Sequence, residues 1–278
     1  MAYPGGKNAP GVYHTIINLM PPHQTYIEPF LGAGAIMRLK RPAALNIGID
    51  IDPGAPKVTM PPVPSPDPSR SADAGKNGEA YRSRETAMAD PHAASGDARH
   101  HHSPGAAIQA SSGGTGDGVL PRFHFVHGNG IDFLACYPFA GNELVYCDPP
   151  YVMATRSGRR LYRCEMADAE HQRLLRVLQD LPCAAMISGY WSEMYAEALA
   201  GWNSVTYDAM TRAGKQKTEW LWFNFPRPTE LHDYRYLGRG FREREKINRR
   251  KKRWVARLER MPELERHALL AAMAEVRC

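Results

Sequence analysis

The chain has 278 residues, 43% of them apolar, and its Lys and Arg residues outnumber Asp and Glu by six. A chain of this length can bury a complete hydrophobic core. Its five cysteines are scattered without a CxxC pair, which argues against a disulfide framework or a zinc site and favours a reducing cytoplasm. No apolar run reaches the roughly 18 to 20 residues that span a bilayer, and the first residues lack a signal-peptide core, so no membrane association is expected.

A strand followed by a glycine-containing turn is predicted near the N-terminus. The strand covers residues 25–30, and Gly32 and Gly34 precede a helical stretch that runs to Leu39. Glycines let the backbone approach a ligand at a helix N-terminus. The spacing is not the full GxGxxG fingerprint, because apolar residues follow Gly34, so a dinucleotide pyrophosphate site is poorly supported. A tight turn without a ligand is the alternative.

A second predicted strand, residues 45–49, ends at Asp50. An acid at this point of a nucleotide-binding βαβ unit can accept hydrogen bonds from the two hydroxyls of a ribose. A solvated strand end that also includes Asp52 explains the same residues equally well.

Residues 53–121 differ in composition from the rest of the chain. Proline and glycine make up about a quarter of this segment, and Tyr81 is its single aromatic residue. Such a segment cannot bury enough apolar surface to offset the entropy of ordering it. We therefore expect a low-complexity, mostly disordered insertion. Its histidines, His92 and residues 100–102, have no carboxylate partners in a fixed geometry, and no metal site is predicted.

The most informative motif is Asp148-Pro149-Pro150-Tyr151, which follows a predicted buried strand, residues 144–147. The carboxyl end of a strand is where open α/β sheets hold their ligands. Asp148 and the carbonyl of Pro149 can accept both protons of an exocyclic amine, while Tyr151 stacks on the base. A proline-rich strand exit is the structural alternative.

Two polar segments beyond this motif carry cations. One is the loop 152–163 with Arg156, Arg159 and Arg160, and the other is the turn 211–217 with Lys215 and Lys217. Cations in these places can bind the phosphates beside an extruded base. Ordinary solvated loops are the alternative.

The remaining elements of this half are predicted to build the core. A helix capped by Asp168 has its leucines on one face. Residues 184–187 form a short buried strand, and residues 204–210 pair with 218–225 as a hairpin. None of these elements has a catalytic assignment.

Residues 229–278 are predicted to form a basic helical appendage. They contain 14 Lys and Arg against 8 Asp and Glu, a net charge of +6 that equals the charge of the whole chain. The densest cluster covers residues 249–253 and precedes an amphipathic run. Binding to a phosphate backbone and packing of the apolar stripe against the main domain are both compatible with this pattern.

Together these motifs resemble the Dam-like class of DNA adenine methyltransferases, in particular its short phage and prophage forms. The ordered motifs are Tyr3-Pro4-Gly5-Gly6-Lys7, Glu28-Pro29-Phe30 with Gly32 and Gly34, Asp50, and Asp148-Pro149-Pro150-Tyr151. The resemblance covers residues 1–52 and 122–228. A folded target-recognition region, which larger relatives carry ahead of the last motif, has no counterpart in the insertion.

The resemblance implies S-adenosylmethionine as the cofactor. The residues that match the family's cofactor contacts are Tyr3, Lys7, Phe30, Gly32, Gly34, Asp50 and Asp148. Asp148 would also meet the target amine, and Tyr151 the adenine. Asn129, ahead of the helical residues 131–134, stands where the family commonly has an acid that meets the cofactor's adenine, and its amide can make similar hydrogen bonds. An Asn-Gly turn is the alternative at this position.

These expectations combine into one prediction. The fold is a Rossmann-like α/β methyltransferase fold with a mixed seven-stranded sheet that ends in an antiparallel hairpin. The catalytic domain comprises residues 1–52 and 122–228, interrupted by the insertion 53–121 and followed by the appendage 229–278. The reaction is direct methyl transfer to the exocyclic amine of an adenine flipped out of DNA, and a cognate restriction endonuclease is a candidate partner. The alternatives are methylation of the cytosine amine or of RNA, and a catalytically degenerate DNA-binding protein.

Overall fold

The computed structural model describes residues 6–53, 120–156, 162–211 and 214–276. Almost all of the predicted insertion lies outside these described residues. Three predicted contact residues, Tyr3, Arg159 and Arg160, also lie outside them.

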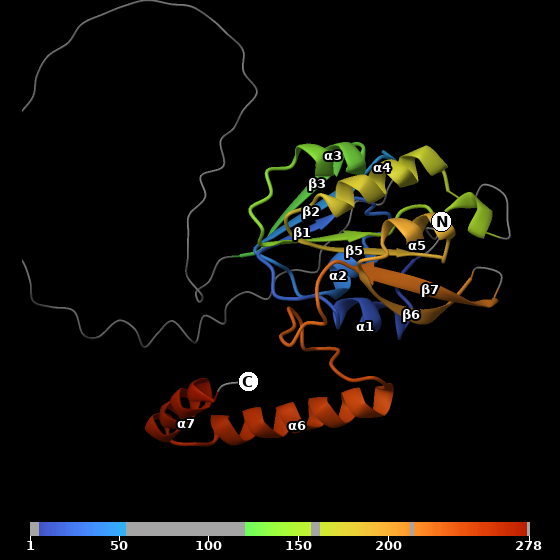
Figure 1. The fold of residues 1–278 in the computed structure, drawn as a ribbon. Helices are drawn as coiled ribbons and strands as arrows, with labels where there is room; N and C mark the ends of the chain where they lie inside the picture. Colours follow the sequence, from blue (N-terminus) through green and yellow to red (C-terminus); the bar gives the residue numbers. More distant parts are fainter. Residues whose placement is uncertain (1–5, 54–119, 157–161, 212–213, 277–278) are drawn as a thin grey trace, which may run out of the picture. The chain divides into compact units, whose positions relative to one another are not determined.

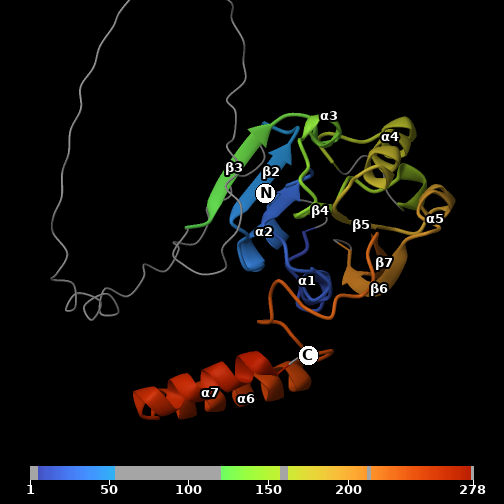
Figure 2. The same ribbon diagram turned by 60° about the vertical axis from the view of Figure 1, so that its left-hand side comes forward.

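A seven-stranded mixed sheet forms the centre of the protein, in the order β3-β2-β1-β4-β5-β7-β6. Its strands are β1 (Thr25–Glu28), β2 (Leu45–Asp50), β3 (Arg122–His127), β4 (Glu143–Cys147), β5 (Ala184–Gly189), β6 (Asn203–Met210) and β7 (Gln216–Phe223). All neighbouring pairs are parallel except β5–β7 and β6–β7, which are antiparallel. Figure 2 shows β3 at one side of the sheet and the β6–β7 pair at the other. The predicted fold class is therefore confirmed.

Helices cover both faces of the sheet. The helices α1 (Val12–Ile17) and α2 (Ala35–Leu39) lie on one face, and α3 (Gly130–Cys136), α4 (Asp168–Gln179) and α5 (Glu193–Ala198) lie on the other (Figure 1). Alternate residues of each strand serve the two faces, because successive side chains of a strand point to opposite sides. In β4, Leu144 and Tyr146 pack in the α1/α2 layer, while Val145 and Cys147 pack in the layer of α3, α4 and α5.

Two predicted boundaries differ from the structure. The first strand ends at Glu28, because Pro29 has no N–H to donate to a ladder. Asp168 is the first helical residue of α4 and not its cap, since Ala167 holds the cap position and its N–H donates to the Glu170 carboxylate at 2.9 Å. A glutamate at the third helical position can satisfy the first turn in this way.

The C-terminal part consists of a docked segment and two helices. The docked segment holds residues 231–236, where His232 N–H donates to the Met20 carbonyl and Asp233 accepts from Arg41 N–H at 2.8 Å. The helices α6 (Phe241–Glu259) and α7 (Glu263–Glu275) contain no buried residue. No helix among the described residues is both long and apolar enough to span a membrane.

Candidate active site

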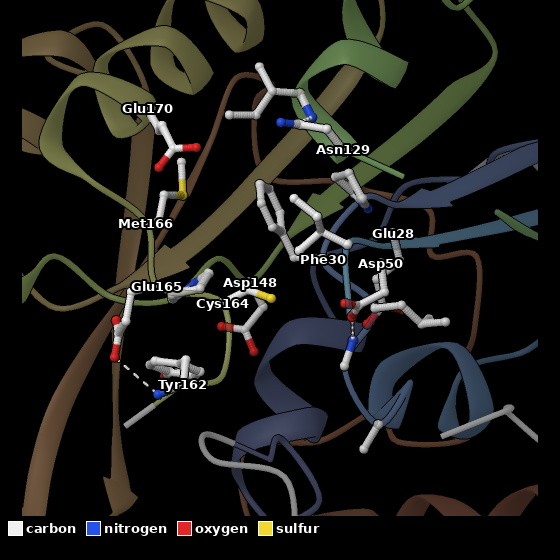
Figure 3. A pocket seen from close by; sticks show the side chains of 18 of the residues that line it. Glu28, Phe30, Asp50, Asn129, Asp148, Tyr162, Cys164, Glu165, Met166 and Glu170 are labelled. Atoms are coloured by element: carbon white, nitrogen blue, oxygen red, sulfur yellow. Dashed lines mark hydrogen bonds between the residues drawn. The ribbon is translucent and has the colours of Figure 1, made fainter. Parts of the chain in front are cut away.

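A cleft opens at the carboxyl edge of the sheet, where β1 and β4 lie side by side and the chain's connections leave in opposite directions. Such a switch point is where open α/β sheets bind ligands. The cleft encloses about 950 Å³ of empty space, including the part open to solvent. Its lining includes Lys7, Glu28, Phe30, Gly32, Asp50, Asn129, Asp148, Pro150 and Tyr162 (Figure 3). The structure thus brings together seven of the predicted site residues from separate segments of the chain.

The glycine turn after β1 forms one wall of the cleft. Gly32 and Gly34 have φ angles of 50° and 61°, a left-handed conformation that other residues rarely adopt. Gly34 is the N-cap of α2 and lies behind the lining. The turn is fixed from the next strand, because Gly32 N–H donates to Asp50 Oδ2 at 2.7 Å.

Asp50 therefore stabilises the glycine turn, in addition to its predicted ribose contact. Its other oxygen, Oδ1, accepts from Asp52 N–H at 2.8 Å. A carboxylate has about four lone-pair sites, so each oxygen keeps acceptor capacity toward the cleft. The ribose contact stays a prediction, and the hydrogen bonds hold the carboxylate at the place where it would be needed.

Asn129 is the N-cap of α3. Its Oδ1 accepts from Ile131 N–H at 2.8 Å and from Asp132 N–H at 3.4 Å. Its amide nitrogen has no acceptor among the described residues and remains available as a donor in the cleft. The next residue must be glycine, because a Cβ on Gly130 would lie 2.1 Å from the Pro29 carbonyl oxygen. This close approach joins the walls from β1 and β3 and explains the Asn-Gly pair.

Asp148 extends into the cleft from the end of β4 (Figure 3). Its Oδ1 receives a salt bridge from Lys7 Nζ at 2.9 Å and a hydrogen bond from Ser188 Oγ at 2.8 Å. No described residue donates to Oδ2. Burial raises the pKa of Asp148, and the ammonium of Lys7 opposes that rise. One oxygen is thus held by the protein, and the other is left to accept from a ligand.

Tyr151 lies behind the cleft and not in its lining. Its side chain is 5% exposed, and its ring packs edge-to-face on Tyr190 with centroids 4.6 Å apart. Its hydroxyl accepts from Lys7 Nζ at 2.5 Å and donates to Glu219 at 2.8 Å. The predicted stacking on a base would require this ring to become accessible. Stacking stays a prediction, and the observed contacts make Tyr151 part of the support of Lys7.

Glu28 is a cleft residue to which the sequence analysis gave no role. Its side chain is 3% exposed, and Tyr26 donates to its Oε2 at 3.0 Å. Burial, with a smaller contribution from Asp148, raises the pKa of Glu28 to about 8. The available signal was its position at the end of a strand two residues before Phe30, at the same sheet edge as the other ligand-facing residues.

The predicted phosphate contacts have different surroundings. The side chain of Arg156 is 3% exposed and pairs with Glu165 at 2.6 Å, so it braces the loop after the Asp-Pro-Pro-Tyr motif instead of offering a free cation. Lys217 donates to the Thr155 carbonyl at 2.5 Å and lies 3.6 Å from the centroid of the Tyr190 ring. Lys215 is exposed. The phosphate contact of Arg156 stays a prediction, and it would require this side chain to leave its pair with Glu165, nine residues along the chain.

The fold and the cleft define a Rossmann-like α/β protein with an acidic ligand site at its switch point. The chain matches no protein-family model and no curated protein. Among solved structures it is similar to the precorrin-8w decarboxylase of Methanobacterium thermoautotrophicum, with a TM-score of 0.40 and 11% identity over 80% of this chain and 94% of that one. It is also similar to an rRNA methylase from Streptococcus thermophilus, with a TM-score of 0.38 and 9% identity over 76% of this chain and 93% of that one.

A third similar structure is a SAM-dependent methyltransferase from Methanosarcina mazei, with a TM-score of 0.37 and 9% identity over 75% of this chain and 95% of that one. TM-scores this low do not identify the reaction, which depends on the residues of the cleft.

Proposed function

We propose that this protein transfers a methyl group from S-adenosylmethionine to the exocyclic amine of adenine in DNA. The observation that carries the proposal is the carboxylate of Asp148, whose Oδ1 is held by Lys7 and Ser188 and whose Oδ2 has no donor among the described residues. Such an oxygen suits a ligand that brings its own N–H group. The adjoining Pro149 carbonyl is a second acceptor, so an amine with two protons is the complementary group.

The cleft also suits the cofactor. Among the described residues, its lining includes the acids Asp50, Asp148 and Glu170 against a single lysine, Lys7, while Glu28 is protonated at neutral pH because its pKa is raised to about 8 and Glu165 is paired with Arg156. This excess of acids favours a ligand with cationic groups, such as a sulfonium and an ammonium. S-adenosylmethionine supplies a methyl group already activated by its positively charged sulfur.

Individual residues match the other parts of the same molecule. The carboxylate of Asp50 can accept from ribose hydroxyls, and the amide nitrogen of Asn129 can donate to a ring nitrogen of adenine. Ile51, which is 50% exposed, and Ile131 give the cleft apolar surface for a flat ring. These assignments use groups whose positions are already fixed by hydrogen bonds within the protein.

The protein's part in the reaction is to orient the amine. An exocyclic amine is a poor nucleophile because its lone pair is delocalised into the ring. Two acceptors, Asp148 Oδ2 and the Pro149 carbonyl, would bind both N–H groups and favour a pyramidal nitrogen with a usable lone pair. Lys7 keeps Asp148 in this orientation. The reacting nitrogen and the methyl donor would then meet in one cleft without a covalent enzyme intermediate.

DNA is the proposed macromolecular substrate. A base must leave the double helix to reach such a cleft, and cations at its rim would bind the flanking phosphates. Lys215, which is exposed in the β6–β7 turn, is one such cation in this proposal. Lys217 and the residues Arg159 and Arg160 belong to the same proposal.

The decisive experiment incubates the protein with methyl-labelled S-adenosylmethionine and either DNA or RNA of matched sequence, followed by digestion to nucleosides and mass analysis. The proposal requires labelled N6-methyladenine from DNA. Label in cytosine, or in RNA alone, would overturn the adenine or the DNA assignment. The Asp148→Ala variant, which removes the acceptor for the amine, serves as the control with impaired transfer. DNA binding without methyl transfer and without cofactor binding in calorimetry would identify a degenerate DNA-binding protein.

A further inference from the structure

Glu219 is a buried carboxylate outside the cleft to which no role has been assigned so far. It lies on β7, is 6% exposed and faces the back of the Asp-Pro-Pro-Tyr motif. Its Oε2 contacts three groups: Lys7 Nζ at 3.2 Å, the Tyr151 hydroxyl at 2.8 Å and the Tyr207 hydroxyl at 3.0 Å. A buried charge is costly unless it is paired and hydrogen-bonded. These three donors supply the partners that the buried Oε2 atom requires.

The donors reach Glu219 from three other segments of the chain. Lys7 belongs to the N-terminal segment, Tyr151 follows β4, and Tyr207 lies opposite Glu219 in the β6–β7 pair. Lys7 has three N–H groups, and it contacts Asp148, Glu219 and the Tyr151 hydroxyl. Glu219 therefore shares the lysine with Asp148, and two anions are balanced by one cation within this group.

We propose that Glu219 is a positioning residue that holds Lys7 and Tyr151 behind Asp148 and keeps Asp148 a strong hydrogen-bond acceptor. When Glu219 is charged, Lys7 pairs with it as well and compensates less of the negative charge of Asp148. Asp148 Oδ2 then stays a strong acceptor for the N–H groups of the amine. Without that charge, Lys7 would neutralise Asp148 more completely. The catalytic consequence rests on the proposed function, whereas the arrangement of Lys7 does not.

The charges around Asp148 give the sign of a pH effect. Among the described residues, the ionisable groups that face it from neighbouring elements are Lys7, Tyr26, Glu28, Tyr146, Cys147, Tyr151, Tyr162, Tyr190, Tyr195, Tyr207 and Glu219. Burial raises the pKa of Asp148 most, Lys7 lowers it, and the negative charge of Glu219 raises it again. Removal of that negative charge therefore lowers the pKa of Asp148. Since Asp148 acts as an anion, the acid limb of the rate profile should move to lower pH.

The test compares Glu219→Gln with Asp208→Asn. Asp208 is an exposed acid of the same hairpin, which accepts from Gln216 and Thr218, so its variant controls for the loss of a carboxylate at the sheet end. In Glu219→Gln we expect kcat to fall about 10- to 100-fold, the effect of losing one charged hydrogen bond. Cofactor affinity should fall less than kcat, because Glu219 does not itself line the cleft and would act on the cofactor only through Lys7. The acid limb should shift downward in Glu219→Gln alone.

A second readout does not depend on activity. Buried in an ion-pair group, Lys7 should react slowly with acetic anhydride, and peptide mass spectrometry can follow its acylation against exposed Lys215. Glu219→Gln should speed the labelling of Lys7 several-fold, since Asp148 and Glu219 both raise the pKa of Lys7. If the wild-type protein methylates no substrate, the proposed function fails, and this labelling alone decides the role of Glu219.

One result would overturn the positioning role: an acid limb and a Lys7 labelling rate that both stay at wild-type values in Glu219→Gln. If kcat falls while both stay unchanged, Glu219 is a packing residue. If Glu219→Gln does not fold, Glu219→Asp keeps the charge but withdraws the carboxylate by one methylene. That variant should also raise Lys7 labelling, and unchanged labelling would contradict the proposal.

Discussion

Two regions of this protein differ in how far their charged side chains are exposed to solvent. At the carboxyl edge of the sheet, Lys7, Asp148 and Glu219 are nearly enclosed, and each contacts a partner from a distant part of the chain. In α6, nine Lys and Arg accompany three Glu, and none of these residues is buried. The pair between Arg249 and Glu245 is typical of this helix, with both side chains exposed and one turn apart.

The difference lies in what each arrangement can specify. A buried ion pair fixes geometry, because breaking it leaves a charge without water or partner. An exposed charge contributes little to stability and attracts any polyanion in proportion to the phosphates that it neutralises. We therefore expect the edge of the sheet to determine chemistry and α6 to determine affinity for nucleic acid. The following predictions test this division, from the largest expected effect on turnover to the smallest.

Replacement of Asp148 by Ala should have the largest effect. It removes the acceptor for the target amine and leaves Lys7 with less compensation of its buried charge. Turnover should fall about 10²- to 10³-fold or more, the range for loss of one preorganised transition-state partner, and cofactor affinity should also weaken. Steady-state methyl transfer and calorimetry measure the two effects. Turnover within threefold of wild type would exclude Asp148 from the reaction.

Two substitutions at Tyr151 separate the contribution of its ring from that of its hydroxyl. Tyr151→Phe loses the hydrogen bonds to Lys7 and Glu219. It keeps the aromatic face, however, and should therefore keep appreciable activity. Tyr151→Ala loses both and should be slower than the Phe variant by about two- to tenfold, because an aromatic contact adds about 0.5–1.5 kcal/mol beyond its buried area. Equal rates for the two variants would contradict any role for the ring.

The stability of a Glu28→Gln variant tests the protonation of the buried carboxylate at the edge of the sheet. Its pKa in the folded protein is about 8, above the unfolded value of about 4.3, so the folded state loses stability as the pH rises between these values. Glu28→Gln resembles the protonated acid and should not show that loss. Without cofactor, the variant should exceed wild type by a few kcal/mol, on the order of 1.4 kcal/mol for each unit of pKa shift, in urea unfolding at pH 8, and match it near pH 4. An exposed control, Glu245→Gln in α6, should change stability by less than about 1 kcal/mol. A pH-independent difference for Glu28→Gln would refute the assigned protonation.

The α6 cluster should affect turnover least. Changing residues 249–253 to Gln should leave the rate at saturating DNA and the sequence preference unchanged, because phosphate contacts carry no sequence information. DNA affinity should fall, and the log–log salt dependence should become shallower by about 0.9 for each phosphate that the variant no longer neutralises. Filter binding over a salt series measures both. An unchanged slope would exclude the α6 cluster from DNA contact and return the DNA-facing role to the loops beside the cleft.

The sequence predicted the sheet because its evidence is local. The continuous apolar run at residues 144–147 marks a strand with both faces covered, and the aromatic-rich run at residues 218–225 marks a further strand. Polar residues at strand ends mark the ligand edge. The cap function of Asn129 was also accessible, since Asn before a helical run is a standard N-terminal signal. These features depend on neighbours within a few residues.

What the sequence did not predict depends on pairs that only folding brings together. Lys7 and Glu219 are 212 residues apart in the sequence, and no periodic pattern relates them. Arg156 carries the same charge as its neighbours in the basic loop, yet its side chain is enclosed and paired with Glu165. This burial makes Arg156 part of the support of the loop, and its contact with phosphate stays a prediction.

The most direct test of the account is a crystal structure with S-adenosylhomocysteine, the product of methyl transfer. We predict that the ribose hydroxyls lie within hydrogen-bond distance of the Asp50 carboxylate, that the adenine meets the amide of Asn129, and that the sulfur points toward Asp148. A ligand bound elsewhere, or one in the cleft with its ribose away from Asp50 and its sulfur away from Asp148, would contradict the proposed active site.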